Sequence, residues 1–404
     1  MSHCRLGMND EAPVSAAGQV DAVAIKRIPA FDYLRTFGVL LVLLHHTVLA
    51  YVTFGFLNPR DPTATFSPIV DAAKWAGFDR IALFNDTFFM PLLFFVSGMF
   101  VWRSLQRKGA ARFLLGRLTR LGIPFVIGVV VLMPVAFYPT MLEIGLVYGW
   151  SQSFGGFWID SARRGFGPPG PLWFVWLLLV FDCFAALFYS LFGRASDGSD
   201  PGAVSVLDNS LLFTAGLIGL SFAAYLPMLG AFGAEQWLGI GPFSVQIGRL
   251  FLYLLYFGAG VAIGARGLGR GAFRADGPFA RRWWAWLLAG LLSYSGLAVT
   301  FELAPQSSLI GYVLVIMIAF VVLGLTSLFV RSARRSVPIL DSLSASSYGI
   351  YLTHYLVVIW LQYAVLRIDL PAVAKAAIVF FGALALCWGS ITALRRIRAV
   401  AKII

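Results

Sequence analysis

Long apolar segments, separated by short stretches rich in polar residues, glycine or proline, follow one another along almost the whole chain. A helix that crosses the hydrocarbon core of a bilayer needs about 20 mainly apolar residues. Ten segments have this character, at residues 33–56, 82–102, 121–142, 172–192, 211–232, 244–265, 283–301, 308–330, 344–366 and 372–394. The pattern predicts an all-α membrane protein, a bundle of about ten transmembrane helices.

The composition also indicates a lipid environment. Hydrophobic residues make up 59% of the 404 residues and charged residues only 12%, and the mean hydropathy is +0.81. Soluble domains carry about a quarter charged residues, so this chain has too few polar side chains to cover a water-facing surface. We therefore expect the lipid bilayer to surround most of it.

The positions of lysine and arginine predict the orientation of the bundle. The loops after the second, sixth and eighth predicted spans, together with the C-terminal end, carry most of these residues, whereas the loops on the other side carry few. Loops rich in lysine and arginine stay in the cytoplasm, so both termini are predicted to be cytoplasmic. Residues 1–30 then form a disordered cytoplasmic tail, 31–394 a transmembrane domain and 395–404 a basic cytoplasmic tail, in a multi-pass protein of the bacterial inner membrane.

A net charge of +12 and a pI near 9.9 can also indicate nucleic-acid binding. Here the basic residues lie in loops between spans rather than in a soluble module with interleaved aromatic residues, so topology and lipid headgroups explain the charge. We expect no nucleic-acid partner. The three cysteines, Cys4, Cys183 and Cys387, are scattered and indicate no metal site.

Ionisable side chains inside a membrane span are costly and indicate a functional site by default. His45 and His46 fall in the first predicted span. Arg35 precedes His46 by eleven residues, so a helix places both on one face, roughly 16 Å apart. An isolated His46 is equally well explained as a buried histidine bonded to a neighbouring helix. Arginine on the same face favours a functional role for both residues.

The ninth predicted span carries a third intramembrane histidine, His354, at a depth similar to that of His46. Tyr351 lies one turn away on the same helix face. We expect the two histidines to line one cavity, and the alternative is a structural network of hydrogen bonds between helices. Asp182 lies in the middle of the fourth predicted span, and its role stays open.

Arg117 and Arg120 are three residues apart and so share a helix face next to the third predicted span. Two planar guanidinium groups at a membrane surface can grip phosphates bidentately. The alternative interpretation is an ordinary basic cluster that only fixes the orientation of the chain. By itself the spacing does not decide between them.

Several motifs in consecutive order between residues 28 and 394 resemble one family, the acyltransferase-3 family of integral membrane acyltransferases. They comprise Asp32 and Arg35 followed by His46, the string Met90-Pro91-Leu92-Leu93-Phe94-Phe95-Val96-Ser97-Gly98, the pair Arg117 and Arg120 before Pro124, the segment Leu172-Trp173-Phe174-Val175, and the segment Ser347-Tyr348-Gly349-Ile350-Tyr351-Leu352-Thr353-His354. The Met-Pro-Leu-Leu-Phe-Phe string is most similar to the branch that includes periplasmic-glucan succinyltransferases.

The resemblance implies an enzyme that moves an acetyl or succinyl group from cytoplasmic acyl-CoA to a hydroxyl of an extracytoplasmic glycan or similar acceptor. It implies His46 as general base with Arg35 beside the reaction, and Arg117 and Arg120 as ligands of acyl-CoA. Cavity or supporting roles fall to Asp32, Ser97, Trp173, Tyr351 and His354. Acyl-CoA is the donor substrate, and we expect no bound cofactor and no metal.

A proton-coupled transporter or exporter of a polar solute is the alternative function, because paired intramembrane histidines can serve a proton pathway. The chain shows no internal repeat of the kind from which many transporters are built. Acidic residues deep within the predicted spans are also absent apart from Asp182. Both observations favour the enzyme.

Overall fold

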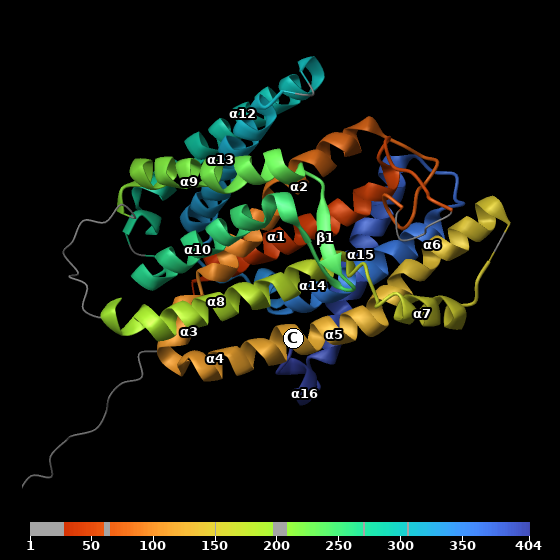
Figure 1. Ribbon diagram of the computed structural model, residues 1–404, viewed down its shortest axis with the longest axis horizontal. Helices are drawn as coiled ribbons and strands as arrows, with labels where there is room; N and C mark the ends of the chain where they lie inside the picture. Colours follow the sequence, from red (N-terminus) through yellow and green to blue (C-terminus); the bar gives the residue numbers. More distant parts are fainter. Residues whose placement is uncertain (1–27, 60–64, 150, 197–207, 270, 305–306) are drawn as a thin grey trace, which may run out of the picture.

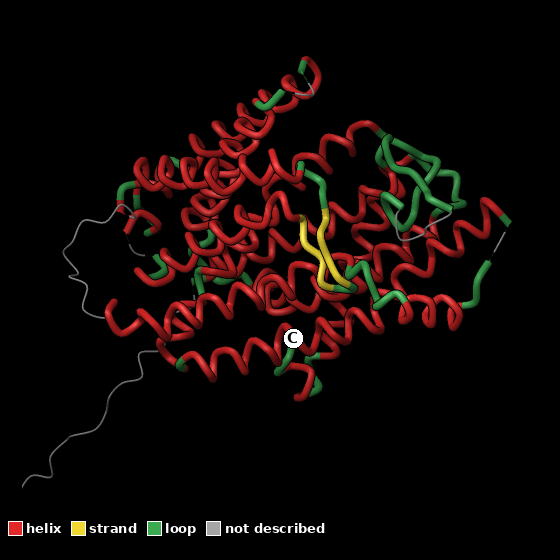
Figure 2. The backbone as a smooth tube through the Cα atoms, in the orientation of Figure 1, coloured by secondary structure: helices red, strands yellow, loops and turns green. Residues whose placement is uncertain are grey.

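The computed structural model describes residues 28–59, 65–149, 151–196, 208–269, 271–304 and 307–404, which are helical apart from loops and one hairpin (Figure 1, Figure 2). The long helices are α1 (Pro29–Val48), α2 (Ala76–Gly98), α6 (Met133–Tyr148), α8 (Trp173–Ser196), α9 (Ser210–Phe232), α10 (Leu250–Arg266), α12 (Trp283–Leu303), α13 (Leu309–Ser332), α14 (Pro338–Val365) and α15 (Ala372–Leu394). The short ones are α3 (Val101–Lys108), α4 (Ala110–Arg117), α5 (Ile123–Ile127), α7 (Phe154–Arg163), α11 (Pro278–Arg281) and α16 (Arg398–Ala401). Strands β1 (Trp237–Ile240) and β2 (Phe243–Gln246) pair in antiparallel orientation.

Nine helical segments of the described chain are long and apolar enough to cross a membrane, which confirms the predicted class of fold. The predicted span that is not among them, 344–366, lies within α14, a helix of 28 residues. Serine and tyrosine side chains, together with His354 and Gln362, lower the mean hydropathy of this helix. α14 has the length of a span but carries polar groups that need partners inside the protein.

The predicted span 244–265 begins too early. Residues Phe243–Gln246 form strand β2, and helix α10 starts only at Leu250. The turn between the strands contains Gly241 with a φ of 56°, a conformation that suits glycine. An apolar run of this length does not distinguish a strand from the first turns of a helix, so the hairpin was not predicted.

The predicted span 121–142 is too short, because the helical segment runs from Ala110 to Tyr148. Two stretches within it, Leu118–Gly122 and Gly128–Leu132, are π-helical. Single π-helical turns inside α-helices are rare and frequent at functional sites. The first of them lies directly after Arg117.

Helix α1 runs through the centre of the bundle (Figure 1). Phe31 and Leu34 near its start belong to the buried apolar cluster shared with α2, α10 and α13, whereas Val42 and Leu43 belong to a second cluster shared with α8, α14 and α15. All four side chains are buried. The helix that carries Arg35 and His46 is therefore enclosed by protein rather than placed against lipid.

Helices α2 and α10 approach each other through glycines. A Cβ atom at Gly260 would lie 2.0 Å from the carbonyl oxygen of Phe95, and one at Gly264 would lie 2.1 Å from that of Met99. Small residues four positions apart let membrane helices pack backbone to backbone, where van der Waals contact replaces the hydrophobic effect. This contact fixes α2 and its Ser97 against α10.

We expect Gly260→Ala to destabilise the protein, because the new methyl group meets the backbone of α2 and forces the helices apart. Overpacking of this kind costs about 1–3 kcal/mol. Gly258→Ala is the matched control, since nothing lies within 4 Å of a Cβ atom at Gly258. Thermal unfolding of both variants in detergent checks the prediction, and equal melting temperatures would contradict it.

The two predicted tails differ in how much of them is described. Of residues 1–30, the first 27 lie outside the described part of the chain, and α1 begins at Pro29. Within 395–404, α16 forms, and Arg395 and Ile404 line a cavity of the bundle. The orientation of both ends relative to the membrane stays a prediction.

Candidate active site

A cavity of about 580 Å³ lies at the end of the bundle where α3, α4 and the C-terminal residues meet. We call it the basic cavity. It is lined by one acidic residue, Asp32, and by the basic residues Arg35, Arg103, Arg107, Lys108, Arg117, Arg120 and Arg395. Arg107 and Lys108 are exposed, so the cavity opens to water at its rim.

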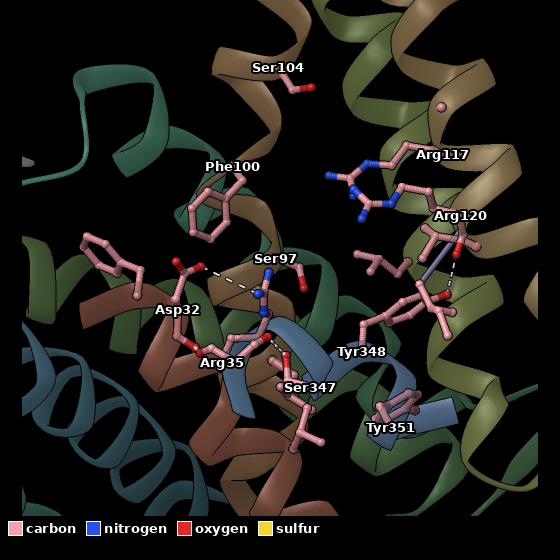
Figure 3. Close-up of a pocket in the computed structure, with 18 of the residues that line it drawn as sticks. Asp32, Arg35, Ser97, Phe100, Ser104, Arg117, Arg120, Ser347, Tyr348 and Tyr351 are labelled. Atoms are coloured by element: carbon pink, nitrogen blue, oxygen red, sulfur yellow. Dashed lines mark hydrogen bonds and ion pairs between the residues drawn. The ribbon is translucent and has the colours of Figure 1, made fainter. Parts of the chain in front are cut away.

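Six of the residues predicted for the site line this cavity, and they come from four separate parts of the chain: Asp32, Arg35, Ser97, Arg117, Arg120 and Tyr351 (Figure 3). Sequence reasoning missed four further cations of the wall, Arg103, Arg107, Lys108 and Arg395. Their signal was present as loop charge, but we interpreted that charge as topology alone. The packing of α3 and the C-terminal segment around one cavity shows that these basic residues line the candidate site, which their positions in the sequence did not reveal.

Arg117 and Arg120 point into the basic cavity with their guanidinium groups next to each other (Figure 3). Arg117 ends α4, and Arg120 lies in the π-helical stretch that follows. Nε of Arg117 lies 3.1 Å from a carboxylate oxygen of Asp182, and its guanidinium carbon lies 5.1 Å from the ring centre of Phe113. The predicted common face of the two arginines is confirmed.

The backbone at Arg120 depends on Pro124. Proline has no N–H group, so it cannot donate to the carbonyl four residues earlier, which is that of Arg120. The hydroxyl of Tyr348, from α14, donates a hydrogen bond to this carbonyl. This hydrogen bond links the wall of the basic cavity at Arg120 to α14, across more than half of the chain.

Arg35 forms an ion pair with Asp32 at 3.6 Å in the first turns of α1. The backbone carbonyl of Asp32 accepts hydrogen bonds from Thr36 at 2.8 Å and from Ser344 at 3.0 Å. The same two hydroxyl groups lie 2.6 Å apart. α1 and α14 are therefore joined by polar contacts at the level of Arg35, inside the bundle.

His46 lies in a second, smaller cavity of about 150 Å³, which we call the histidine cavity. His45 and the predicted Trp173 also line it. Arg35 and His46 share a helix, as predicted, but they reach different cavities. Among the described residues, Tyr351 alone lines both cavities, and its hydroxyl donates to the carbonyl of Pro171.

The imidazoles of His46 and His354 lie close together, with ring centres 5.3 Å apart, and Tyr355 packs against His46 at 4.9 Å. Nδ1 of His354 lies 2.6 Å from the carbonyl oxygen of Tyr351. A carbonyl only accepts, so Nδ1 carries the hydrogen and Nε2 keeps its lone pair. The two histidines are neighbours, but the prediction that they line one cavity is wrong, because His354 lines neither of the described cavities.

The backbone around His46 is held in place by α14. Nε2 of Gln362 donates to the carbonyl oxygens of His46 and Thr47, at 2.9 and 3.0 Å. These carbonyls belong to the last turn of α1, where no intrahelical donor follows. The amide of Gln362 therefore stabilises the helix end that presents the imidazole.

The histidine cavity also has a charged wall that the sequence did not predict. Arg249 lies 2.7 Å from Asp86 and 3.6 Å from Glu235, and both acids line the cavity with Gln246. Burial raises the pKa of Glu235, which lies in the loop before β1. Asp86 belongs to predicted span 82–102, so the statement that Asp182 is the only acid within the spans is wrong. Asp86 was overlooked because it lies close to the start of that predicted span.

In the described residues, a helical bundle with nine membrane-spanning candidates, an arginine-lined cavity and a second cavity lined by His45 and His46 defines a multi-pass membrane protein with a polar site. A family model described as an acyltransferase domain, that of acyltransferase 3, matches residues 28–392, and the chain belongs to this family. It is therefore a membrane-bound acyltransferase. Neither the curated proteins nor the solved structures compared with the chain gave a match.

Proposed function

We propose that the protein transfers an acetyl or succinyl group from acyl-CoA, bound in the basic cavity, to a hydroxyl of a glycan or similar acceptor in the histidine cavity. The basic end would face the cytoplasm, and the histidine cavity would be reached from outside the inner membrane. One observation carries the proposal: among the described residues, Tyr351 lines both an arginine-lined cavity and a cavity that contains His46.

The basic cavity suits the donor because CoA carries three phosphate groups on its nucleotide end. The paired guanidinium groups of Arg117 and Arg120 can bind phosphate oxygens in a bidentate manner, while Arg107 and Lys108 at the rim attract the anion. The pantetheine arm would then run inward past Arg35. In this arrangement Arg35 contacts polar atoms of the donor and lies away from His46.

The histidine cavity suits a general base. A neutral imidazole at His46 can accept the proton of the acceptor hydroxyl as its oxygen attacks the thioester carbonyl. The new C–O bond forms, the C–S bond breaks, and the CoA thiolate leaves and takes up the proton. His354 and Tyr355 pack against the imidazole of His46 and limit access of bulk water from that side, where water would otherwise compete with the acceptor.

In the proposed reaction the thioester passes Tyr351 to reach His46, so the size of this side chain should affect how much water reaches the thioester. We expect Tyr351→Ala to join the two cavities and admit water, so that acyl-CoA hydrolysis in the absence of acceptor rises about tenfold or more. Tyr351→Phe, which keeps the ring and loses only the hydrogen bond to Pro171, is the matched control. Release of free CoA, followed with a thiol reagent, measures the effect. Unchanged hydrolysis in the alanine variant would contradict a separating role.

The proposed reaction is tested with the purified protein in proteoliposomes. Labelled acetyl-CoA or succinyl-CoA is supplied on one side with an envelope glycan extract on the other, and the glycan is analysed by mass spectrometry. Acylated glycan is the expected product, and the preferred donor identifies the acyl group. Labelled solute that crosses the membrane without thioester consumption would instead support the transporter.

The transporter has one observation in its favour, the row of titratable groups Asp86, His45, His46 and His354. Ring centres of His45 and His46 lie 5.5 Å apart, and those of His46 and His354 lie 5.3 Å apart. Such a row can pass a proton. Membership of an acyltransferase family favours the enzymatic role, in which the same groups move the proton of the acceptor.

A further inference from the structure

Asp182 is an acidic residue in the interior of α8, and its side chain is fully buried. Within the described residues, neither of its carboxylate oxygens has a hydrogen-bond donor, and its one ion-pair partner is Arg117. Asp182 does not line the basic cavity or the histidine cavity. It therefore touches neither the proposed donor nor the proposed acceptor.

The way in which Asp182 meets Arg117 leaves one edge of the guanidinium group available. The carboxylate approaches Nε, at 3.1 Å, from α8. The ring of Phe113, on α4, covers one face of the group at 5.1 Å. The two terminal nitrogens, Nη1 and Nη2, point into the basic cavity beside Arg120 (Figure 3). They form the planar fork that matches two oxygens of a phosphate.

A buried ion pair is weak evidence for stability. Taking a carboxylate out of water costs several kcal/mol, and an apolar side chain of similar volume is often as stable. Such a pair favours one orientation of its partner, because leaving the buried charge uncompensated costs about 3–5 kcal/mol. A flexible arginine on the wall of a wide cavity needs such a constraint to keep one rotamer.

We propose that Asp182 is a positioning residue for the donor site: it holds the guanidinium group of Arg117 through Nε, so that Nη1 and Nη2 face a phosphate of CoA. This role rests on the proposed binding of acyl-CoA in the basic cavity. Asp182 acts through Arg117 alone and takes no proton from the reaction.

The experiment compares two donors, acetyl-CoA and S-acetylpantetheine, of which the second lacks the whole phosphorylated nucleotide portion of CoA. Acetyl-CoA carries the nucleotide phosphates, and S-acetylpantetheine carries none. For Asp182→Asn we expect KM for acetyl-CoA to rise about tenfold with kcat unchanged, while KM for S-acetylpantetheine stays at the wild-type value. Cys183→Ser, at an exposed neighbouring position of α8, is the matched control and should change neither KM.

A double variant tests whether the effect passes through Arg117. If it does, Arg117→Ala with Asp182→Asn has the same KM for acetyl-CoA as Arg117→Ala alone, because the two side chains act as one unit. Asp182→Leu provides a second substitution that fills the buried site with apolar volume, and it should give the same rise in KM. The Asp182→Leu protein replaces the Asp182→Asn protein in the experiment if the latter does not fold in detergent.

Three results would overturn the inference. An equal rise in KM for both donors would show a general structural role, and additive effects in the double variant would show that Asp182 acts elsewhere. A fall in KM for acetyl-CoA would show that Asp182 masks the charge of Arg117. Absence of acetyl-CoA binding and turnover in the wild-type protein is a separate result, which would reject the proposed function itself and this role with it.

Discussion

Replacement of His46 by alanine is expected to lower kcat/KM for acyl transfer by roughly 10²- to 10⁴-fold, the range over which a general base contributes. The imidazole of His46 lines the histidine cavity, whereas His354, whose ring centre lies 5.3 Å from it, lines neither cavity. The loss should fall on kcat, because we propose that the donor binds in the basic cavity, which His46 does not line. Transfer of label from acyl-CoA to the acceptor measures it.

His45→Ala provides the comparison for this variant. His45 lines the same cavity, but it is rotated by about 100° around α1 and packs against Phe89, with ring centres 5.2 Å apart. We expect a much smaller loss of turnover from it. Membrane insertion and melting temperature of both variants should match the wild type. Normal acylation by the His46→Ala protein would rule out the proposed base.

Replacement of both Arg117 and Arg120 by alanine is expected to raise KM for acyl-CoA by about 10²-fold or more. Hydrogen bonds to charged groups contribute about 1.5–3 kcal/mol each, and each 1.4 kcal/mol is a factor of ten. kcat should change less, since neither residue lines the histidine cavity. Titration of the initial rate with acyl-CoA, together with direct binding of labelled CoA, separates the two parameters.

The matched control is the pair Arg281 and Arg282, which is exposed and lies outside the basic cavity. Its replacement by alanine removes the same amount of positive charge from a loop predicted on the same side. We expect unchanged KM. If the variant lacking Arg117 and Arg120 kept its donor affinity and changed only its orientation in the membrane, the basic pair would serve topology alone.

The interval between Arg35 and His46 shows what helix geometry alone can predict. An interval of eleven residues places two side chains on one face whatever the rest of the chain does, and the structure has them on one helix, α1. The interval says nothing about what lies between them in space. In the structure Arg35 and His46 line different cavities, and Tyr351, which comes from α14, lines both.

The sequence by itself determined the membrane class and most of the helices, because a span is recognised from the local density of apolar residues. It also identified candidate site residues. Ionisable side chains such as Arg35, His46 and His354 cost free energy inside a bilayer and therefore indicate a functional site. The π-helical stretches and the hairpin were not predicted, because the apolar runs that contain them do not distinguish these local conformations from a regular helix.

Only the tertiary structure decided which charges face each other. Asp182 meets Arg117, Arg249 meets Asp86 and Glu235, and the loop cations gather around one cavity. In each case the partners come from different helices or loops, and the packing of those elements sets their distance. An ion pair depends on distance and burial, which no local pattern of residues contains.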